Sequence, residues 1–298
     1  PAPAPHFVDL LPPRPGNPRN SEGGFVQLRD GRLLFAYSKF TGGGGDHDRA
    51  VIAARYSRDL GETWTSDDQV LLGGEGGMNV MSVSFLRLRK SGELAFFYIR
   101  KNSETNASPA VRFSRDEGRT WSDAVIVIPD PTYNVLNNDR VVQLKRGRLI
   151  APVALHTADG KWTSRGNVRF YLSDDEGRTW RRSQSALECP DGASRNGLQE
   201  PGVVELKDGR LLMFARTSLG HQYVSYSSDG GDTWSPAERG NLASPLSPAS
   251  IERIPKTGHL LAVWNDHAGI APELAGKRTP RDLLEQCLAR IDRALQRA

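Results

Sequence analysis

The chain repeats one eight-residue turn four times. "SRDLGETW" begins at Ser57 and near copies begin at Ser114, Ser173 and Ser227, so the spacings are 57, 59 and 54 residues. Ser and Asp side chains bond to their own turn backbone, Gly supplies a positive φ, and Trp caps a hydrophobic layer. Four copies of one active site in one chain are implausible, so we interpret this box as scaffold. Functional residues should then be ones that do not repeat.

A glycine-containing hairpin precedes each box, and a fifth follows the last one. Segments such as "VQLRDGRLLFAYS" place a polar pair and Gly between two β-rich runs, which predicts a hairpin. The turn glycines are Gly31, Gly92, Gly147, Gly209 and Gly258. A third strand such as "VIAARYS" follows each of the first four hairpins, and a weaker fourth strand follows the box. Four strands in a unit of about 50–60 residues predict an all-β propeller.

Composition argues against several other classes of protein. Thirty Gly and 19 Pro favour turn-rich β-structure over a helical bundle. No apolar run is long enough for a membrane span, and the 39 basic and 35 acidic residues are too evenly spread to predict a nucleic-acid partner. The two cysteines, Cys189 and Cys287, predict neither a disulfide framework nor a metal site, and we expect no cofactor. The sequence is compatible with secretion or a periplasmic location, and it indicates no oligomeric state.

We divide the chain into an N-terminal extended segment (1–19), a propeller (20–280) and a C-terminal amphipathic helix (281–298). Thr279 and Pro280 suit a helix start, and the apolar residues that follow are spaced by 4, 3 and 4 residues, namely Leu284, Leu288, Ile291 and Leu295. We expect this stripe to dock on the propeller. About four and a half blades are recognisable, so the propeller has five units or lacks a sixth.

The segments just before the first strand of each hairpin differ from blade to blade. They read "PRNSEGG", "GGMNVMS", "VLNNDR", "NGLQEPG" and "SPLSPAS". Equivalent strand starts of a propeller converge on one end of the central channel, where ligands usually bind. Candidate binding residues in these segments are Arg19, Glu22, Arg140, Gln199 and Glu200. We predict that such side chains surround a small polar molecule.

Two further stretches carry candidate chemistry. In "QEPGVVELKDGRLLMFAR", Glu200 opens one arm of a hairpin and Arg216 closes the other, so we expect them to be neighbours. They would form a structural ion pair or a base with an anion clamp. In "TGGGGDHD", a glycine loop ends in Asp46, His47 and Asp48, which is either a flexible surface loop or a lid that delivers an acid.

The boxes together with the Glu200 hairpin resemble the sialidase superfamily, whose members are six-bladed propellers with Asp-box (BNR) repeats. The resemblance covers roughly residues 20–280. It implies that Glu200 polarises a tyrosine nucleophile and that Arg216 grips the substrate carboxylate. It also implies that Arg278 is a further carboxylate-binding arginine. The acid/base residue would be Asp46, with Asp48 as the alternative.

The sequence departs from that family at two places. Where the first substrate-binding arginine is expected, the chain offers Arg19 slightly early and Glu22 near the place itself, with Arg140 as another anion contact. Glu22 would repel the carboxylate of a sialic acid. The ligand could therefore be another anionic sugar, such as a uronate. The family's nucleophile belongs to a sixth blade that we do not find, and neither Tyr133 nor Tyr223 stands in its place.

The leading hypothesis is a sialidase-like glycoside hydrolase of the exo-α-sialidase type. Its substrate would be terminal sialic acid or a related carboxylate-bearing sugar, and no metal or cofactor is expected. A non-catalytic propeller that binds carbohydrate or protein remains open. The missing sixth blade favours the binding propeller, whereas the pairing of Glu200 with Arg216 and the Asp46 loop favour the hydrolase.

Overall fold

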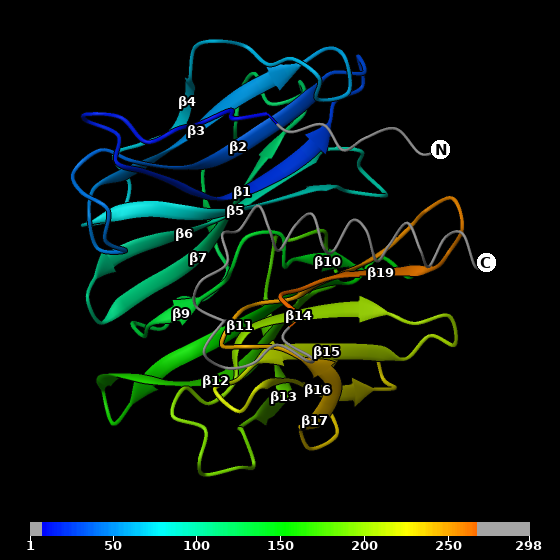
Figure 1. Cartoon of the computed structure of the whole chain (residues 1–298). Coiled ribbons are helices and arrows are strands. Elements are labelled where there is room, and N and C mark those ends of the chain that lie inside the picture. The colour runs from blue at the N-terminus through cyan, green and yellow to red at the C-terminus, as the bar shows by residue number, and fades with distance from the viewer. Residues whose placement is uncertain (1–7, 267–298) are drawn as a thin grey trace.

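The computed structural model describes residues 8–266, which form five antiparallel sheets that we call blades one to five in chain order. Blade one contains β1 (Arg19–Gln27), β2 (Leu33–Phe40), β3 (Ala50–Ser57) and β4 (Gln69–Leu72). Blade two contains β5 (Asn79–Arg87), β6 (Leu94–Ser103), β7 (Asn106–Ser114) and β8 (Val125–Ile126). The blades follow one another in space as they do in the chain (Figure 1).

The remaining blades continue the same topology. Blade three contains β10 (Val142–Gln143), β11 (Leu149–Ala158), β12 (Lys161–Ser173) and β13 (Arg181–Leu187), while β9 (Asn134–Val135) also pairs with β11. Blade four contains β14 (Gln199–Glu205), β15 (Leu211–Arg216), β16 (His221–Ser227) and β17 (Glu238–Ala243). Blade five is described as the pair β18 (Ser250–Arg253) and β19 (Leu260–Val263).

This arrangement confirms the predicted all-β propeller architecture, including all five hairpins. The predicted helix over 281–298 and Arg278 lie outside the described residues, and the number of blades stays a prediction. No helix within residues 8–266 has the length and apolar character needed to cross a membrane.

Alternation along the strands builds the core between neighbouring blades. Leu34 and Ala36 of β2 lie fully buried on one face of blade one, where Val83 and Phe85 of β5 pack against them. Successive strand residues point to opposite faces, so each blade offers one apolar layer to each neighbour. The interior of the molecule is therefore a stack of blade-to-blade interfaces.

The four boxes adopt one hydrogen-bonded turn. In blade three, the Ser173 hydroxyl donates to Asp175 (2.8 Å) and accepts from the Gly177 amide (2.7 Å). Asp175 also accepts from the Thr179 amide (2.9 Å) and hydroxyl (2.6 Å), and the Trp180 indole donates to the Gly177 carbonyl (3.0 Å). The Ser, Asp and Thr side chains make these bonds in all four boxes, which explains why they repeat, whereas the indole bond is made by Trp64, Trp180 and Trp234 but not by Trp121 within the described residues.

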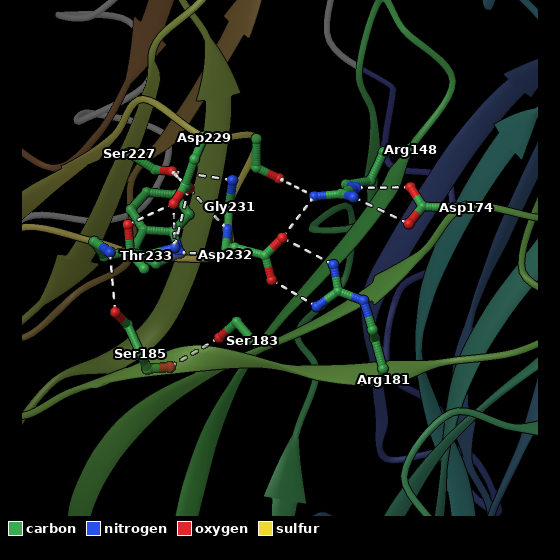
Figure 2. Close-up of polar contacts among 12 residues, drawn as sticks. Arg148, Asp174, Arg181, Ser183, Ser185, Ser227, Asp229, Gly231, Asp232 and Thr233 are labelled. Carbon is green, nitrogen blue, oxygen red and sulfur yellow. Dashed lines mark hydrogen bonds and ion pairs between the residues drawn. The ribbon is translucent and has the colours of Figure 1, made fainter.

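The boxes also tie each blade to the one before it. Glu117, in the second box, accepts a bond from the Arg29 amide in the hairpin turn of blade one (2.8 Å). In the fourth box, the Asp232 carboxylate lies between Arg148 and Arg181 of blade three (Figure 2). These contacts lie at the end of the blades where the hairpin turns are, because Leu33 at the start of β2 pairs with Ser57 at the end of β3.

At the opposite end, the first strands begin with an irregularity. The pairing register shifts between Ser21 and Gly24 in β1, between Met81 and Ser84 in β5, and between Gln199 and Gly202 in β14. In the first four blades one residue at or just before the first strand has a positive φ: Glu22 (54°), Ser82 (61°), Asp139 (55°, three residues before β10) and Glu200 (50°). A bulge re-aims a side chain that a regular strand would direct elsewhere. We call these four positions the bulge residues.

Candidate active site

One polar cavity of about 210 Å³ lies at the bulge end of the blades. Its lining includes three carboxylates from two blades and comprises Glu22, Asp46, His47, Met81, Ser82, Ile99, Lys101, Ala107, Tyr133, Val135, Asn137, His156, Trp162, Gln199, Glu200 and Arg216. Blades one to four all contribute to this lining. Four of the five strand starts expected to converge contribute to this lining, and the segment 244–250 before β18 does not.

Glu200 and Arg216 are neighbours, as the hairpin predicted. Gln199 pairs with Arg216 across β14 and β15, and an Arg216 Nη2 atom lies 3.3 Å from Glu200 Oε1. Gly202 follows the bulge because a Cβ there would lie 2.2 Å from the Phe214 ring. Burial raises the pKa of Glu200 above its ordinary value, although Arg216 and Arg140 act against the shift. Within residues 8–266, Glu200 Oε2 and Arg216 Nε have no hydrogen-bond partner.

The glycine loop between β2 and β3 delivers Asp46 and His47 to the cavity. Asn79 donates to the Asp46 carbonyl (3.0 Å), and the Lys101 ammonium donates to the same carbonyl (2.7 Å). Asp48 folds back instead, accepting the Gly45 amide (2.7 Å), and does not line the cavity. The loop backbone is therefore held in place from blade two.

Arg19 binds Asp46 rather than lining the cavity itself. Its Nη1 atom lies 2.5 Å from Asp46 Oδ1 and 3.2 Å from the Gly44 carbonyl. Burial acts to raise the pKa of Asp46, but the hydrogen bond and charge of Arg19 hold it below its ordinary value, with help from Lys101. Asp46 is therefore ionised at neutral pH.

Glu22 faces the cavity from the first bulge. Its Oε2 atom accepts a 2.6 Å bond from the hydroxyl of Ser82, which is the bulge residue of the next blade. Burial raises the pKa of Glu22, although the Ser82 bond and Arg19 oppose that shift. Glu22 and Glu200 thus keep their protons to a higher pH than Asp46 does.

Sequence reasoning missed one wall of the cavity. Lys101, Tyr133, His156 and Trp162 come from the second and third blades. Burial, together with the charges of Asp46 and Glu22, raises the pKa of Tyr133 to about 12. Burial lowers the pKa of Lys101 and of His156. A Lys, Tyr or His inside an otherwise ordinary strand carries no local signal of its function.

The other predicted residues lie in different places. Gln199 lines the cavity and donates to the Ser164 carbonyl (3.0 Å). Arg140 is 6% exposed, donates to the Ala249 carbonyl (2.8 Å) and is not part of the lining. No cluster of His, Cys, Asp and Glu that could hold a metal ion occurs among residues 8–266.

A larger hollow, of about 450 Å³, lies at the box end of blades one and two. Its lining includes Thr63, whose hydroxyl is bonded to Asp59, and Glu117, which is paired with Arg87. These groups are engaged in the turn and in contacts between blades, so this hollow is a weaker candidate despite its size.

Comparison with known proteins identifies the family. A model of the BNR repeat-like domain matches residues 31–288. The chain belongs to that family. The BNR propeller is 31% identical over 254 residues to the sialidase of Micromonospora viridifaciens, covering 75% of this chain and 37% of that protein. It is 31% identical over 147 residues to the anhydrosialidase of Macrobdella decora, covering 45% of this chain and 18% of that protein. It therefore spans less than half of either relative.

Solved structures place the propeller among sialidases by fold. A Dyadobacter fermentans protein of unknown function superposes with a TM-score of 0.68 at 19% identity, covering 85% of this chain and 76% of that one. The intramolecular trans-sialidase of Ruminococcus gnavus superposes with a TM-score of 0.65 at 17% identity, covering 83% and 77%. At these identities the likeness shows the shared fold, and membership of the sialidase superfamily is confirmed together with the family match.

Proposed function

We propose that this BNR propeller is a sialidase-like glycoside hydrolase of the exo-α-sialidase type. The observation that carries the proposal is a single cavity containing Glu200 beside Arg216, with Asp46 and Glu22 from another blade. Relatives named as sialidases support the reaction class. The substrate would be terminal sialic acid or a related sugar that bears a carboxylate.

Two of the three carboxyl groups in the cavity can supply the proton transfers that hydrolysis needs. Cleaving a glycosidic bond takes one group that gives a proton to the leaving oxygen and one that accepts a proton from the attacking group. As the resemblance implies, Asp46 would be the acid/base residue and Glu200 would polarise a tyrosine nucleophile; both line the cavity.

Arg216 would bind the carboxylate of the substrate. It lines the cavity, and its Nε atom has no partner within the described part of the chain. A guanidinium can form two parallel bonds with a carboxylate, which gives both affinity and orientation. Lys101, which also lines the cavity and donates to the Asp46 carbonyl, would supply a second positive charge.

The test is turnover of a fluorogenic α-sialoside and a fluorogenic glucuronide by the purified chain, followed by binding of the released sugar. We expect Arg216→Ala to weaken binding of that sugar by about 2–4 kcal/mol, because a charge-assisted contact is lost. Arg210→Ala is the control, because Arg210 pairs with Asp208 outside the cavity. Equal binding of the sugar by wild type and Arg216→Ala would show that Arg216 does not bind the substrate carboxylate.

A non-catalytic carbohydrate-binding propeller is the second candidate. One observation favours it: Arg19, expected to bind substrate, is paired with Asp46, which leaves Arg216 as the arginine in the cavity lining among residues 8–266. A single arginine suffices for binding a carboxylate. Saturable binding of free sialic acid or glucuronic acid without turnover of either glycoside would favour this function.

A further inference from the structure

The hairpin that joins β11 to β12 carries an exposed tryptophan to the mouth of the cavity. Trp162 is 51% exposed, and it is the only one of the exposed large hydrophobic side chains within residues 8–266 that also lines the cavity. A half-exposed indole that also lines a polar cavity presents an apolar face that a ligand in the cavity could cover. A function therefore has to be sought for this ring.

The local sequence fixes the position of the ring. Asp159 (φ 50°) and Gly160 (φ 72°) form a two-residue turn with both residues left-handed, which is the tight hairpin turn that Asp-Gly favours. The turn sets Ala158 opposite Lys161 and Thr157 opposite Trp162. Trp162 thus sits on a short, paired hairpin end rather than on a loose loop.

Neighbouring rings orient the indole. The register of β11 and β12 shifts between Leu155 and Thr157, and His156 lies at that shift. The His156 and Trp162 rings are nearly parallel, with centroids 6.3 Å apart and planes 11° apart. His156 Nδ1 is bonded to the Thr163 carbonyl (2.9 Å), and its ring meets Tyr133 edge-on at 6.3 Å.

The cavity therefore has two unlike walls. Trp162, His156 and Tyr133 form an aromatic wall from the mouth inward, while Glu22, Asp46 and Glu200 provide carboxylates elsewhere in the lining. A sugar ring also has two unlike parts, a face of C–H groups and an edge of hydroxyls. Aromatic rings suit the first and carboxylates the second.

We propose that Trp162 forms a second sugar subsite, which binds the residue attached to the sugar that is cleaved. This rests on the proposed function. At about 210 Å³ the cavity is smaller than the pockets of about 300–1,000 Å³ that enclose drug-sized ligands, so it suits one ring. The next ring of a glycan must then lie at the mouth, where the indole is. The ligand class is thus a di- or oligosaccharide, or a glycoconjugate with a sugar at that position.

The experiment compares two substrates of one sugar, a methyl α-sialoside and an α-sialyl-galactoside, or the matching glucuronides. We expect Trp162→Ala to lower kcat/KM about three- to tenfold more for the disaccharide than for the methyl glycoside. Trp162→Phe should restore most of this difference, and Lys161→Ala, an exposed neighbour on the same hairpin, should not produce it. Equal losses on both substrates, or no loss on either, would overturn the subsite.

A binding measurement distinguishes a wrong subsite proposal from a wrong hydrolase proposal. Titration of wild type and Trp162→Ala with the same two compounds, by calorimetry, requires no turnover. One outcome is that neither compound is hydrolysed while wild type binds the disaccharide more tightly than the methyl glycoside and Trp162→Ala does not. That result would support the subsite and reject the hydrolase proposal. If the two proteins show the same preference, or neither binds, the subsite is rejected. Thermal unfolding of each variant confirms that the hairpin has folded.

Discussion

The box turns and the bulge residues are both repeated from blade to blade, but they differ in what is repeated. In the boxes the side chains repeat, because Ser, Asp and Thr make the same bonds within the turn in every box. At the bulges only the backbone repeats. A left-handed residue occurs at the first strand of blades one to four, and its side chain is Glu22, Ser82, Asp139 or Glu200.

This difference shows where a repeat protein can change its function. A turn built from side-chain bonds loses stability when a side chain changes, so its sequence is constrained in every copy. A bulge built from backbone geometry tolerates different side chains and directs each toward the channel end. Three of the four bulge residues line the cavity, namely Glu22, Ser82 and Glu200.

The largest expected effect comes from a bulge residue. Glu200→Gln should lower turnover at least about 100-fold, because an amide cannot donate or accept the proton that a carboxyl transfers. The midpoint of thermal unfolding should change little. Glu205→Gln is the control on the same strand, since Glu205 accepts a bond from the Lys145 amide outside the cavity. Activity that survives in Glu200→Gln would break the link between bulges and function.

A box residue should show the reverse behaviour. Ser173→Ala leaves the buried Gly177 amide without its acceptor, which should lower the free energy of unfolding by about 1–3 kcal/mol. Denaturant unfolding measures this change, and turnover per folded molecule should stay at the wild-type value. Ser228→Ala, at an exposed box position, is the control, with an expected change within about 0.5 kcal/mol. A loss of turnover in folded Ser173→Ala would contradict the scaffold role.

The two regions should also respond to pH in opposite directions. Bonds from Thr120 and Ser114 lower the pKa of Asp116, in the second box, to about 2, so the stability that it contributes is present above its unfolded pKa and lost as pH falls toward 2. Burial raises the pKa of Glu22. Its contribution to the free energy of unfolding is therefore present at low pH and is lost as pH rises through its pKa in the folded state. Unfolding measured from pH 2 to 8 should therefore show that Asp116→Asn costs most above pH 5.

Glu22→Gln supplies the other half of that comparison. Relative to wild type, its stability should improve as pH rises from about 4 to 7, because a neutral amide avoids burying a charge. A variant whose stability difference from wild type is the same at every pH would show that Glu22 titrates normally.

The smallest expected effect comes from a left-handed residue without a role in the cavity. Leu60, in the first box, has a φ of 57° and is 77% exposed. Leu60→Gly should raise the free energy of unfolding by up to about 1 kcal/mol, because Gly adopts this conformation without strain. Ser82→Gly should bring no such gain, since it removes the bond to Glu22. Thermal unfolding of both variants tests whether the bulge residue differs from the box residue.

Much of the scaffold could be predicted from the sequence because its signals are local. A turn of the type at Gly31 or a box of the type at Ser57 is specified by adjacent residues, so each can be recognised without knowing the fold. The pairing of Glu200 with Arg216 was also predictable, because one hairpin joins them. The assignment of Glu200, Asp46 and Arg216 to the substrate remains a prediction.

The sequence by itself determined the blades, their boxes and the place in each blade where variation collects, because all of these follow from contacts within one blade. Apart from the pairing of Glu200 with Arg216, only the tertiary structure decided which cavity side chains meet. It brought Lys101, Tyr133, His156 and Trp162 to the cavity and placed Arg19 on Asp46. The physical reason is that burial and charge at one end of a propeller are set by several blades together, and no single blade's sequence carries that information.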